Sequence, residues 1–153
     1  MSGLAIRCKN LVKRYPGGVT AVNGLDLDVR EGECFGLLGP NGAGKTTTMD
    51  IIEGILPQTS GEVEILGHTW GNGDRHIREK IGISLQETQL SEKLTVRETL
   101  RLFRSFYPEG LSPEQSIDLV SLGEKADARV GKLSGGQKQR LAVACAMVGD
   151  PRL

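Results

Sequence analysis

The 153-residue sequence predicts an α/β fold, and three observations support this prediction. Apolar side chains recur with a period of two in the first thirty residues, which is typical of half-buried strands. An apolar run, a glycine-rich stretch and a helical pattern then follow one another between residues 34 and 56. From Ser91 to Lys132 the period becomes helical. With 38% hydrophobic residues, the chain has enough apolar surface for one folding unit.

Five segments have the patterns of strands. Apolar and polar residues alternate in residues 4–9 and 25–30, so we expect antiparallel sheet over the first thirty residues. The run CFGLL, residues 34–38, predicts a strand that is buried on both faces. Residues 61–67 alternate again, and the run IGISL, residues 81–85, predicts another apolar strand.

A helix is predicted immediately after the glycine-rich stretch. Residues 45–56 place Met49, Ile52 and Leu56 on one helical face, and Pro57 is expected to end the helix. The order of strand, glycine-rich loop and helix indicates an α/β core.

Two capping boxes predict the helices of an insert. Thr95 is followed three residues later by Glu98, and the same helix has one apolar face, formed by Val96, Leu100 and Phe103. A second helix is predicted to begin at Ser112-Pro113, with Gln115 completing its box, and to close near Gly123.

Charge and composition exclude several classes of partner. Nineteen basic residues balance nineteen acidic ones, so no overall field favours nucleic acid or an anionic membrane surface. The longest apolar run, Leu141–Gly149, is far shorter than the roughly 20 residues of a membrane span, and we expect a cytosolic chain without a signal peptide. The cysteines are interpreted as buried reduced thiols: Cys8, Cys34 and Cys145. His68 and His76 have no partner at the sequence spacing of metal ligands, and Trp70 stands alone, so these three residues are interpreted as structural or surface residues.

The glycine-rich stretch GPNGAGKTT matches the P-loop pattern G-x-x-x-x-G-K-[ST] at every fixed position. In such a loop, backbone N–H groups and the start of the following helix face the phosphates. Lys45 is expected to add charge at the β- and γ-phosphates, and the Thr46 hydroxyl to ligate Mg²⁺. The alternative is a glycine-rich turn with a chance lysine. We therefore predict a P-loop NTPase core whose nucleotide contacts are Gly39, Pro40, Asn41, Gly42, Ala43, Gly44, Lys45, Thr46 and Thr47.

A second phosphate-shaped turn, LSGGQ, occurs at residues 133–137 and is called the signature turn below. Ser134 and Gln137 form a capping box for the helix that follows, which is a sufficient structural explanation for both residues. A serine hydroxyl, two glycines and a helix N-terminus also make an anion site, and a simple cap does not require two consecutive glycines. Both interpretations can hold together.

With these two motifs in this order and separation, the chain resembles the nucleotide-binding subunits of ATP-binding cassette (ABC) transporters. The resemblance implies that the signature turn contacts the γ-phosphate of ATP bound to the P-loop of a second subunit, head to tail. Ser134 and Gly136 would make those contacts within a turn that comprises Leu133, Ser134, Gly135, Gly136 and Gln137. The fold implied is a P-loop core with an N-terminal antiparallel β subdomain and a helical signature-motif subdomain, incomplete at the C-terminus.

Two further site residues are implied by the resemblance. Gln86 lies where the family has a glutamine that approaches Mg²⁺ and the attacking water, and whose loop faces the membrane partner. Together with Thr46 it would form the metal site; its alternative is a polar residue at a strand end. Tyr15 matches the family's aromatic residue that stacks on adenine, and its alternative is a surface turn tyrosine.

Within the family, the segments LQET and EKLTVRETL look most like ATPase subunits of export-type systems. The resemblance then implies ATP and Mg²⁺ as cofactors, a homodimer, a separate transmembrane permease subunit, and a cytoplasmic, peripheral location at the membrane. The alternative is a soluble ABC protein of translation or DNA maintenance, but such proteins usually have two cassettes or a coiled coil. No heptads and no basic excess occur here, so we expect no nucleic-acid partner.

The resemblance also predicts a division of the chain and its loss of activity. We expect a β subdomain with the P-loop core over 1–86, a helical insert over 87–132, and the signature turn and its helix over 133–153. The family continues with a strand ending in Asp-Glu and a switch histidine, whereas this sequence stops at VGDPRL. Residues 1–153 alone are therefore expected to be a nucleotide-binding fragment with weak or no Mg-ATP binding and no catalysis.

Overall fold

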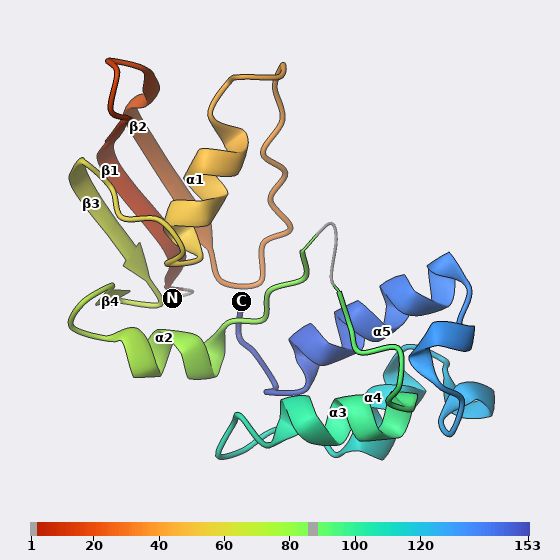
Figure 1. Ribbon diagram of the computed structural model, residues 1–153. Helices are drawn as coiled ribbons and strands as arrows, with labels where there is room; N and C mark the ends of the chain where they lie inside the picture. Colours follow the sequence, from red (N-terminus) through yellow and green to blue (C-terminus); the bar gives the residue numbers. More distant parts are fainter. Residues whose placement is uncertain (1–2, 86–88) are drawn as a thin grey trace. The chain divides into compact units, whose positions relative to one another are not determined.

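The computed structural model describes residues 3–85 and 89–153. Its backbone divides into two compact units, Met1–Ile77 and Arg78–Leu153. The first unit is built around a β-sheet and the second around helices (Figure 1). This composition agrees with the predicted α/β class.

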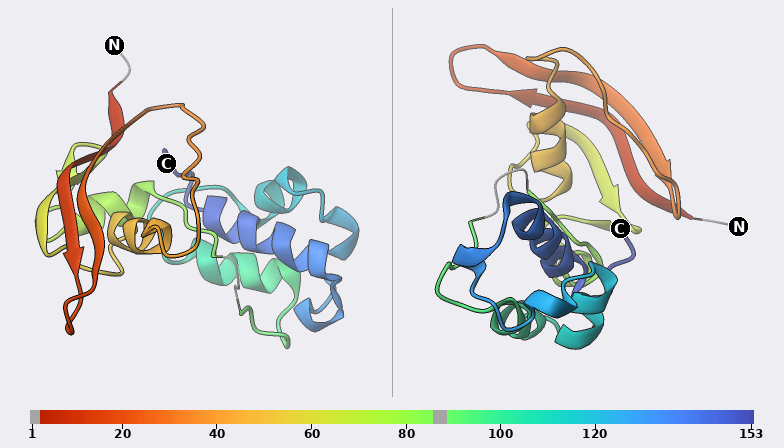
Figure 2. Two further views of the ribbon diagram at one scale, coloured as in Figure 1. Left: turned by 90° about the horizontal axis from the view of Figure 1, so that it is seen from above. Right: turned by 90° about the vertical axis from the view of Figure 1, so that its right-hand side faces the viewer.

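The sheet of the first unit has four strands in the order β2-β1-β3-β4, and every neighbouring pair is antiparallel. Figure 2 shows β1 and β2 side by side as one long hairpin. The antiparallel sheet predicted for the first thirty residues is therefore confirmed. The four strands are β1 (Leu4–Arg14), β2 (Thr20–Arg30), β3 (Ser60–Ile65) and β4 (His68–Thr69).

Helix α1 (Lys45–Ile52) ends four residues earlier than predicted. Gly54 adopts a left-handed φ of 73°, and a Cβ placed on it would lie 2.6 Å from the ring of Trp70. The Trp70 indole N–H donates to the Ile52 carbonyl oxygen at 3.1 Å, so this ring packs on the end of the helix. The predicted apolar face is wrong in part, because Ile51 is buried at the core whereas Met49 is 41% exposed.

Neither of the two predicted apolar strands at 34–38 and 81–85 forms a strand among the described residues. A strand requires a hydrogen-bonded neighbour, and no described strand pairs with either segment. Leu38 is consequently 91% exposed, and Cys34 is also exposed, so the expectation that all three thiols are buried is wrong at this position. Beside the second segment, the Gly82 N–H donates to the Leu153 carbonyl oxygen at 2.8 Å, and the Leu153 and Arg152 N–H groups donate to the Lys80 carbonyl oxygen at 3.2 and 2.8 Å.

The second unit surrounds one hydrophobic core. Side chains of the helical insert, such as Leu100 and Ile117, pack together with Leu141 of the helix that follows the signature turn. The division of the chain at residues 86 and 132 stays a prediction. The helical elements are α2 (Asp74–Lys80), which begins in the first unit, α3 (Val96–Arg104), α4 (Pro113–Leu119), η1 (Gly123–Lys125), η2 (Val130–Lys132) and α5 (Gly135–Met147).

All three capping boxes are confirmed. The Thr95 hydroxyl oxygen accepts the Glu98 N–H at 3.2 Å at the start of α3, and Ser112 accepts the Gln115 N–H at 3.1 Å at the start of α4. Helix α4 ends at Leu119, somewhat before the position expected from the sequence. Among the described residues, no helix is long and apolar enough to cross a membrane.

Candidate functional site

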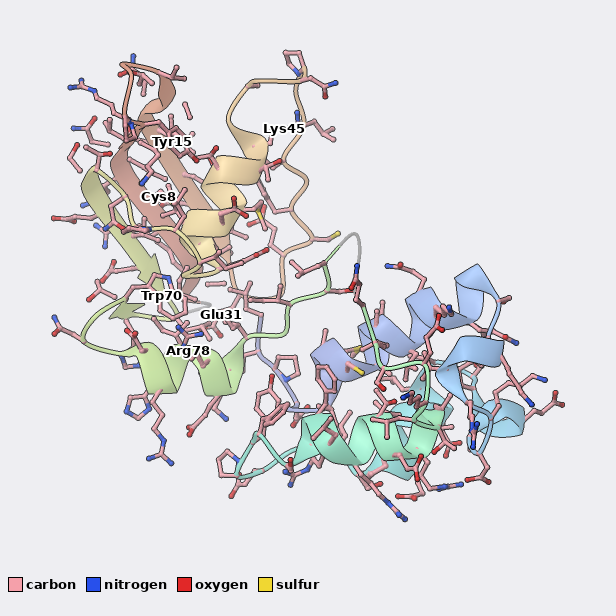
Figure 3. All side chains as sticks on the ribbon, in the orientation of Figure 1. Cys8, Tyr15, Glu31, Lys45, Trp70 and Arg78 are labelled. Atoms are coloured by element: carbon pink, nitrogen blue, oxygen red, sulfur yellow. The ribbon has the colours of Figure 1, made fainter. Side chains whose placement is uncertain are left out.

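The P-loop, residues 39–46, leads into the N-terminus of α1 as the sequence predicts (Figure 3). Gly42 and Gly44 have left-handed φ values of 82° and 79°, a conformation that glycine adopts without steric cost. Gly44 is the N-cap of α1 and supplies no side-chain cap, so the first N–H groups of the helix have no side-chain acceptor from it. An exposed helix N-terminus of this kind favours a bound anion.

Lys45 lies across this loop. Its Nζ donates hydrogen bonds to the Gly39 carbonyl oxygen at 2.8 Å and to the Pro40 carbonyl oxygen at 2.7 Å. Residues 39–43 are all exposed, so the ammonium group is close to a surface that solvent reaches. Phosphate oxygens could replace these two carbonyls as acceptors and would add a full opposite charge.

The P-loop packs tightly against β2. A Cβ placed on Gly44 would lie only 2.2 Å from the Ala21 carbonyl oxygen, so this glycine is required by close packing as well as by its φ value. Ala21 was missed by sequence reasoning, because a motif shows that a glycine is needed but not which segment approaches it. A mostly apolar cavity of about 310 Å³ lies beside the loop, lined in part by Val22, Leu25, Leu37 and Leu38.

The first turn of α1 provides hydroxyl groups of different accessibility. Thr46 is exposed and Thr47 is half-buried, whereas Thr48 is buried in the core. No group of three or more His, Cys, Asp or Glu side chains that could hold a metal ion occurs in the part of the chain that the structure describes. The exposed Thr46 hydroxyl fits Mg²⁺, which usually keeps several waters and binds substrate phosphates with few protein ligands. Gln86, the other predicted metal contact, lies outside the described residues.

Tyr15 lies in the turn between β1 and β2, where its N–H donates to the Val19 carbonyl oxygen at 2.8 Å. Its side chain is 37% exposed, and the Lys13 ammonium lies 5.4 Å from the ring centroid. Figure 3 shows Tyr15 and Lys45 at the same end of the first unit. The ring of Tyr15 is therefore accessible to a ligand, but it already makes a cation–π contact with the Lys13 ammonium.

The signature turn caps α5. The Ser134 hydroxyl oxygen accepts the Gln137 N–H at 3.3 Å, and the Ser134 N–H donates to Gln137 Oε1 at 2.9 Å. This arrangement uses the serine oxygen only as an acceptor, so its hydroxyl proton is still available to a phosphate oxygen. The preceding residue, Leu133, is buried at 7% exposure and anchors the turn in the core of the second unit.

Gly135 and Gly136 are placed differently from Gly44. Neither has a left-handed φ, and a Cβ placed on either would meet no heavy atom of the described residues within 4 Å outside the adjacent backbone of α5. Alanine is a better helix former than glycine by about 0.8–1 kcal/mol. The packing and conformation of the described chain thus give no reason for two glycines at the start of α5.

Comparison with known proteins gives a consistent result. A family model described as "ABC transporter" matches residues 22–153. Relatives called "Nod factor export ATP-binding protein I" include one from Burkholderia orbicola (strain AU 1054), which is 42% identical over 99% of this chain and 51% of its own length. Another, from Rhizobium sp. (strain N33), is 41% identical over 100% of this chain and 52% of its own length. The chain thus spans about half the length of these curated relatives.

Solved structures support the same fold. One described as the ATP-binding subunit of an ABC transporter has a TM-score of 0.83 and 27% identity, covering 96% of this chain and 63% of that one. A dimeric ATP-binding cassette in a post-hydrolysis state, bound to ADP and Pi, has a TM-score of 0.80 and 31% identity, covering 95% of this chain and 70% of that one.

Proposed function

The chain belongs to the ABC transporter family, and on that premise we propose that it forms the ATP-binding part of a subunit that powers an export system. In the proposed cycle, two copies associate head to tail around ATP, and the subunit hydrolyses ATP to drive a separate membrane permease. It would lie in the cytoplasm at the inner face of the membrane, held there by the permease. The names of the relatives support export as the direction of transport.

One observation carries this proposal. The same chain has two helix N-termini suited to an anion, and only the P-loop places a lysine ammonium inside its own site. The P-loop would therefore hold the triphosphate of its own subunit through Lys45 and the first N–H groups of α1. The signature turn, with open space above Gly135 and Gly136, would accept the γ-phosphate presented by the second copy.

The residues of the chain have separate roles in this proposal. Tyr15 would support the adenine ring, and the exposed Thr46 hydroxyl would ligate Mg²⁺, which supplies charge neutralisation at the phosphates when bound. Ser134 would donate its hydroxyl proton to a γ-phosphate oxygen while it continues to cap α5. We expect residues 1–153 alone to hydrolyse no ATP above background, because no carboxylate at the expected place orients a water.

The test is the Lys45→Ala variant of the full-length protein. Losing a hydrogen bond to a charged group costs about 1.5–3 kcal/mol, which is roughly 10- to 150-fold in ATP affinity. Lys125→Ala is the matched control, because it removes the same charge from a residue of η1 that belongs to neither motif. ATP binding is measured by calorimetry and hydrolysis by phosphate release. ATPase activity of Lys45→Ala within about threefold of the wild type would contradict the assignment.

A further inference from the structure

A short backbone ladder holds the segment that leads into the signature turn. Residues 92–97, called the strap below, run antiparallel to residues 126–131, with an isolated bridge between Thr95 and Arg129. Both segments lie in the second unit. The ladder consists of backbone N–H to carbonyl bonds of 2.9–3.2 Å: Arg97 to Ala126, Val96 to Ala128, Val130 to Leu94, and Gly131 to Glu92.

At the last pair of the ladder, Gly131 and Glu92, the two backbones leave little room for a side chain. A Cβ placed on Gly131 would lie 3.2 Å from the Glu92 Cβ and 3.3 Å from the Glu92 carbonyl oxygen. Gly131 does not have a left-handed φ, so close approach of the strap, and not backbone conformation, explains glycine at this position. The Lys138–Glu92 ion pair at 3.4 Å is exposed and is expected to add little.

The rung at Gly131 lies three residues before Ser134. Val130, just before Gly131, and Leu133, just before Ser134, are both buried in the core, and the Leu133 N–H donates to the Val130 carbonyl oxygen at 3.1 Å. The segment that enters the turn is thus held both by its core side chains and by hydrogen bonds from Val130 and Gly131 to carbonyl oxygens of the strap. A displacement of residues 92–94 of the strap, which precede α3, would reach Ser134 through this short connection without passing along α3 and α4.

We propose that the strap positions the signature turn, with Glu92 and Gly131 as positioning residues that set the place of Ser134 and the first N–H groups of α5. Its consequence for ATP-dependent association rests on the proposed function, whereas the positioning itself does not. Any partner that moves residues 89–94 would thereby change the geometry of the signature turn. Movement of the strap would in this way regulate how the signature turn binds the γ-phosphate of the second copy.

The test compares two glycine substitutions in short 3₁₀-helices of the same unit. Gly131→Ala adds a methyl group against Glu92, whereas Gly123→Ala adds one where no heavy atom lies within 4 Å. Hydrogen–deuterium exchange of the full-length protein is followed by mass spectrometry for peptides that cover residues 134–140. We expect exchange at the capping-box amides to rise about tenfold in Gly131→Ala, the size of losing one backbone hydrogen bond, and to stay unchanged in Gly123→Ala.

A rescue variant separates positioning from general stability. The double variant Glu92→Gly, Gly131→Ala removes the nearer contact, with the Glu92 Cβ, but keeps the 3.3 Å contact with the Glu92 carbonyl oxygen, so exchange should return part of the way to the wild-type rate. The crowding requires a shift of only a few tenths of an ångström, so both variants are expected to fold. An equal rise of exchange throughout α3 and α5, no rise in Gly131→Ala, or failure of the rescue would overturn the proposal.

A functional measurement distinguishes this proposal from the proposed function. In Gly131→Ala, ATP-dependent association of two copies should weaken while ATP binding to the monomer is unchanged. If the exchange results hold but the wild type shows no ATP-dependent association, the proposed function fails and the positioning role stands. If association and monomer binding weaken equally, the positioning role is wrong.

Discussion

Replacing Gly135 and Gly136 together with alanine is expected to stabilise the fold and to prevent ATP-dependent association. Apart from the adjacent backbone of α5, neither added methyl group meets a heavy atom within 4 Å in the part of the chain that the structure describes, and neither position has a left-handed φ. Alanine gains about 0.5–1 kcal/mol over glycine in a helix interior, and because these are the first two residues of α5 the gain should be at most about 1–2 kcal/mol for both changes together. For a chain of this size, that gain raises Tm by about 2–4 °C per kcal/mol.

The control is Gly44→Ala, which changes the same residue type in the other motif. Its Cβ would lie 2.2 Å from the Ala21 carbonyl oxygen, and its φ of 79° costs an L-residue about 1–2 kcal/mol even without that clash. Gly44→Ala should consequently lower Tm, although both substitutions affect glycines at helix N-termini. Tm shifts of opposite sign would show that Gly44 is required by close packing, whereas Gly135 and Gly136 are not.

The assay measures Tm by scanning calorimetry and association by light scattering of the full-length protein with and without Mg-ATP. Methyl groups on the surface offered to the partner's γ-phosphate should keep it out of hydrogen-bond reach, so association should be lost while ATP binding to the monomer persists. A lower Tm for the double alanine variant would refute the argument from open space. Unchanged association would refute the trans role of the signature turn.

Of three further predictions, two concern the thiols and one concerns helix α1. Burial raises the pKa of Cys8 to about 11 and of Cys145 to about 12, so at pH 8 a thiol reagent should modify only Cys34 in the native chain and all three cysteines after denaturation. Because the native thiols keep protons that the unfolded thiols release, the free energy of unfolding should fall as pH rises from about 9 to 12. Gly54→Ala should destabilise α1 by about 1–3 kcal/mol and shift the fluorescence of Trp70, since the added Cβ would lie 2.6 Å from that ring; an unchanged spectrum and unfolding midpoint would contradict this packing.

Features that depend on nearby residues could be predicted from the sequence. Each capping box joins a hydroxyl to a residue three positions away, so Ser134 and Gln137 contain all the information that their hydrogen bonds require. The glycine pattern of the P-loop is local in the same way. The sequence thus gave reliable starting points for α3, α4 and α5.

Features that depend on distant partners could not be predicted. The strand expected at 34–38 has the right composition but no hydrogen-bonded neighbour among the described residues, and composition does not supply a ladder. The end of α1 depends on Trp70, which lies 16 residues after Gly54 in the sequence and cannot be assigned to that helix by periodicity. The strap is a third example, because pairing of 92–97 with 126–131 leaves no local pattern.

The charges near the N-termini of α1 and α5 explain why the signature turn of one copy would bind a phosphate that is already held by the P-loop of another. The Lys45 ammonium lies within the P-loop, 2.7 and 2.8 Å from two of its carbonyl oxygens, so this site has its own cation for an anionic ligand. On the first two turns of α5, the Lys138 ammonium instead pairs with Glu92, and the Arg140 guanidinium donates to the Val120 and Ser121 carbonyl oxygens. The cations of α5 itself thus already have partners, and its N-terminus offers an anion N–H dipoles and one hydroxyl, which are weaker toward an anion than a full charge. Such a turn is suited to a phosphate that another P-loop already holds, and alone it should bind ATP poorly.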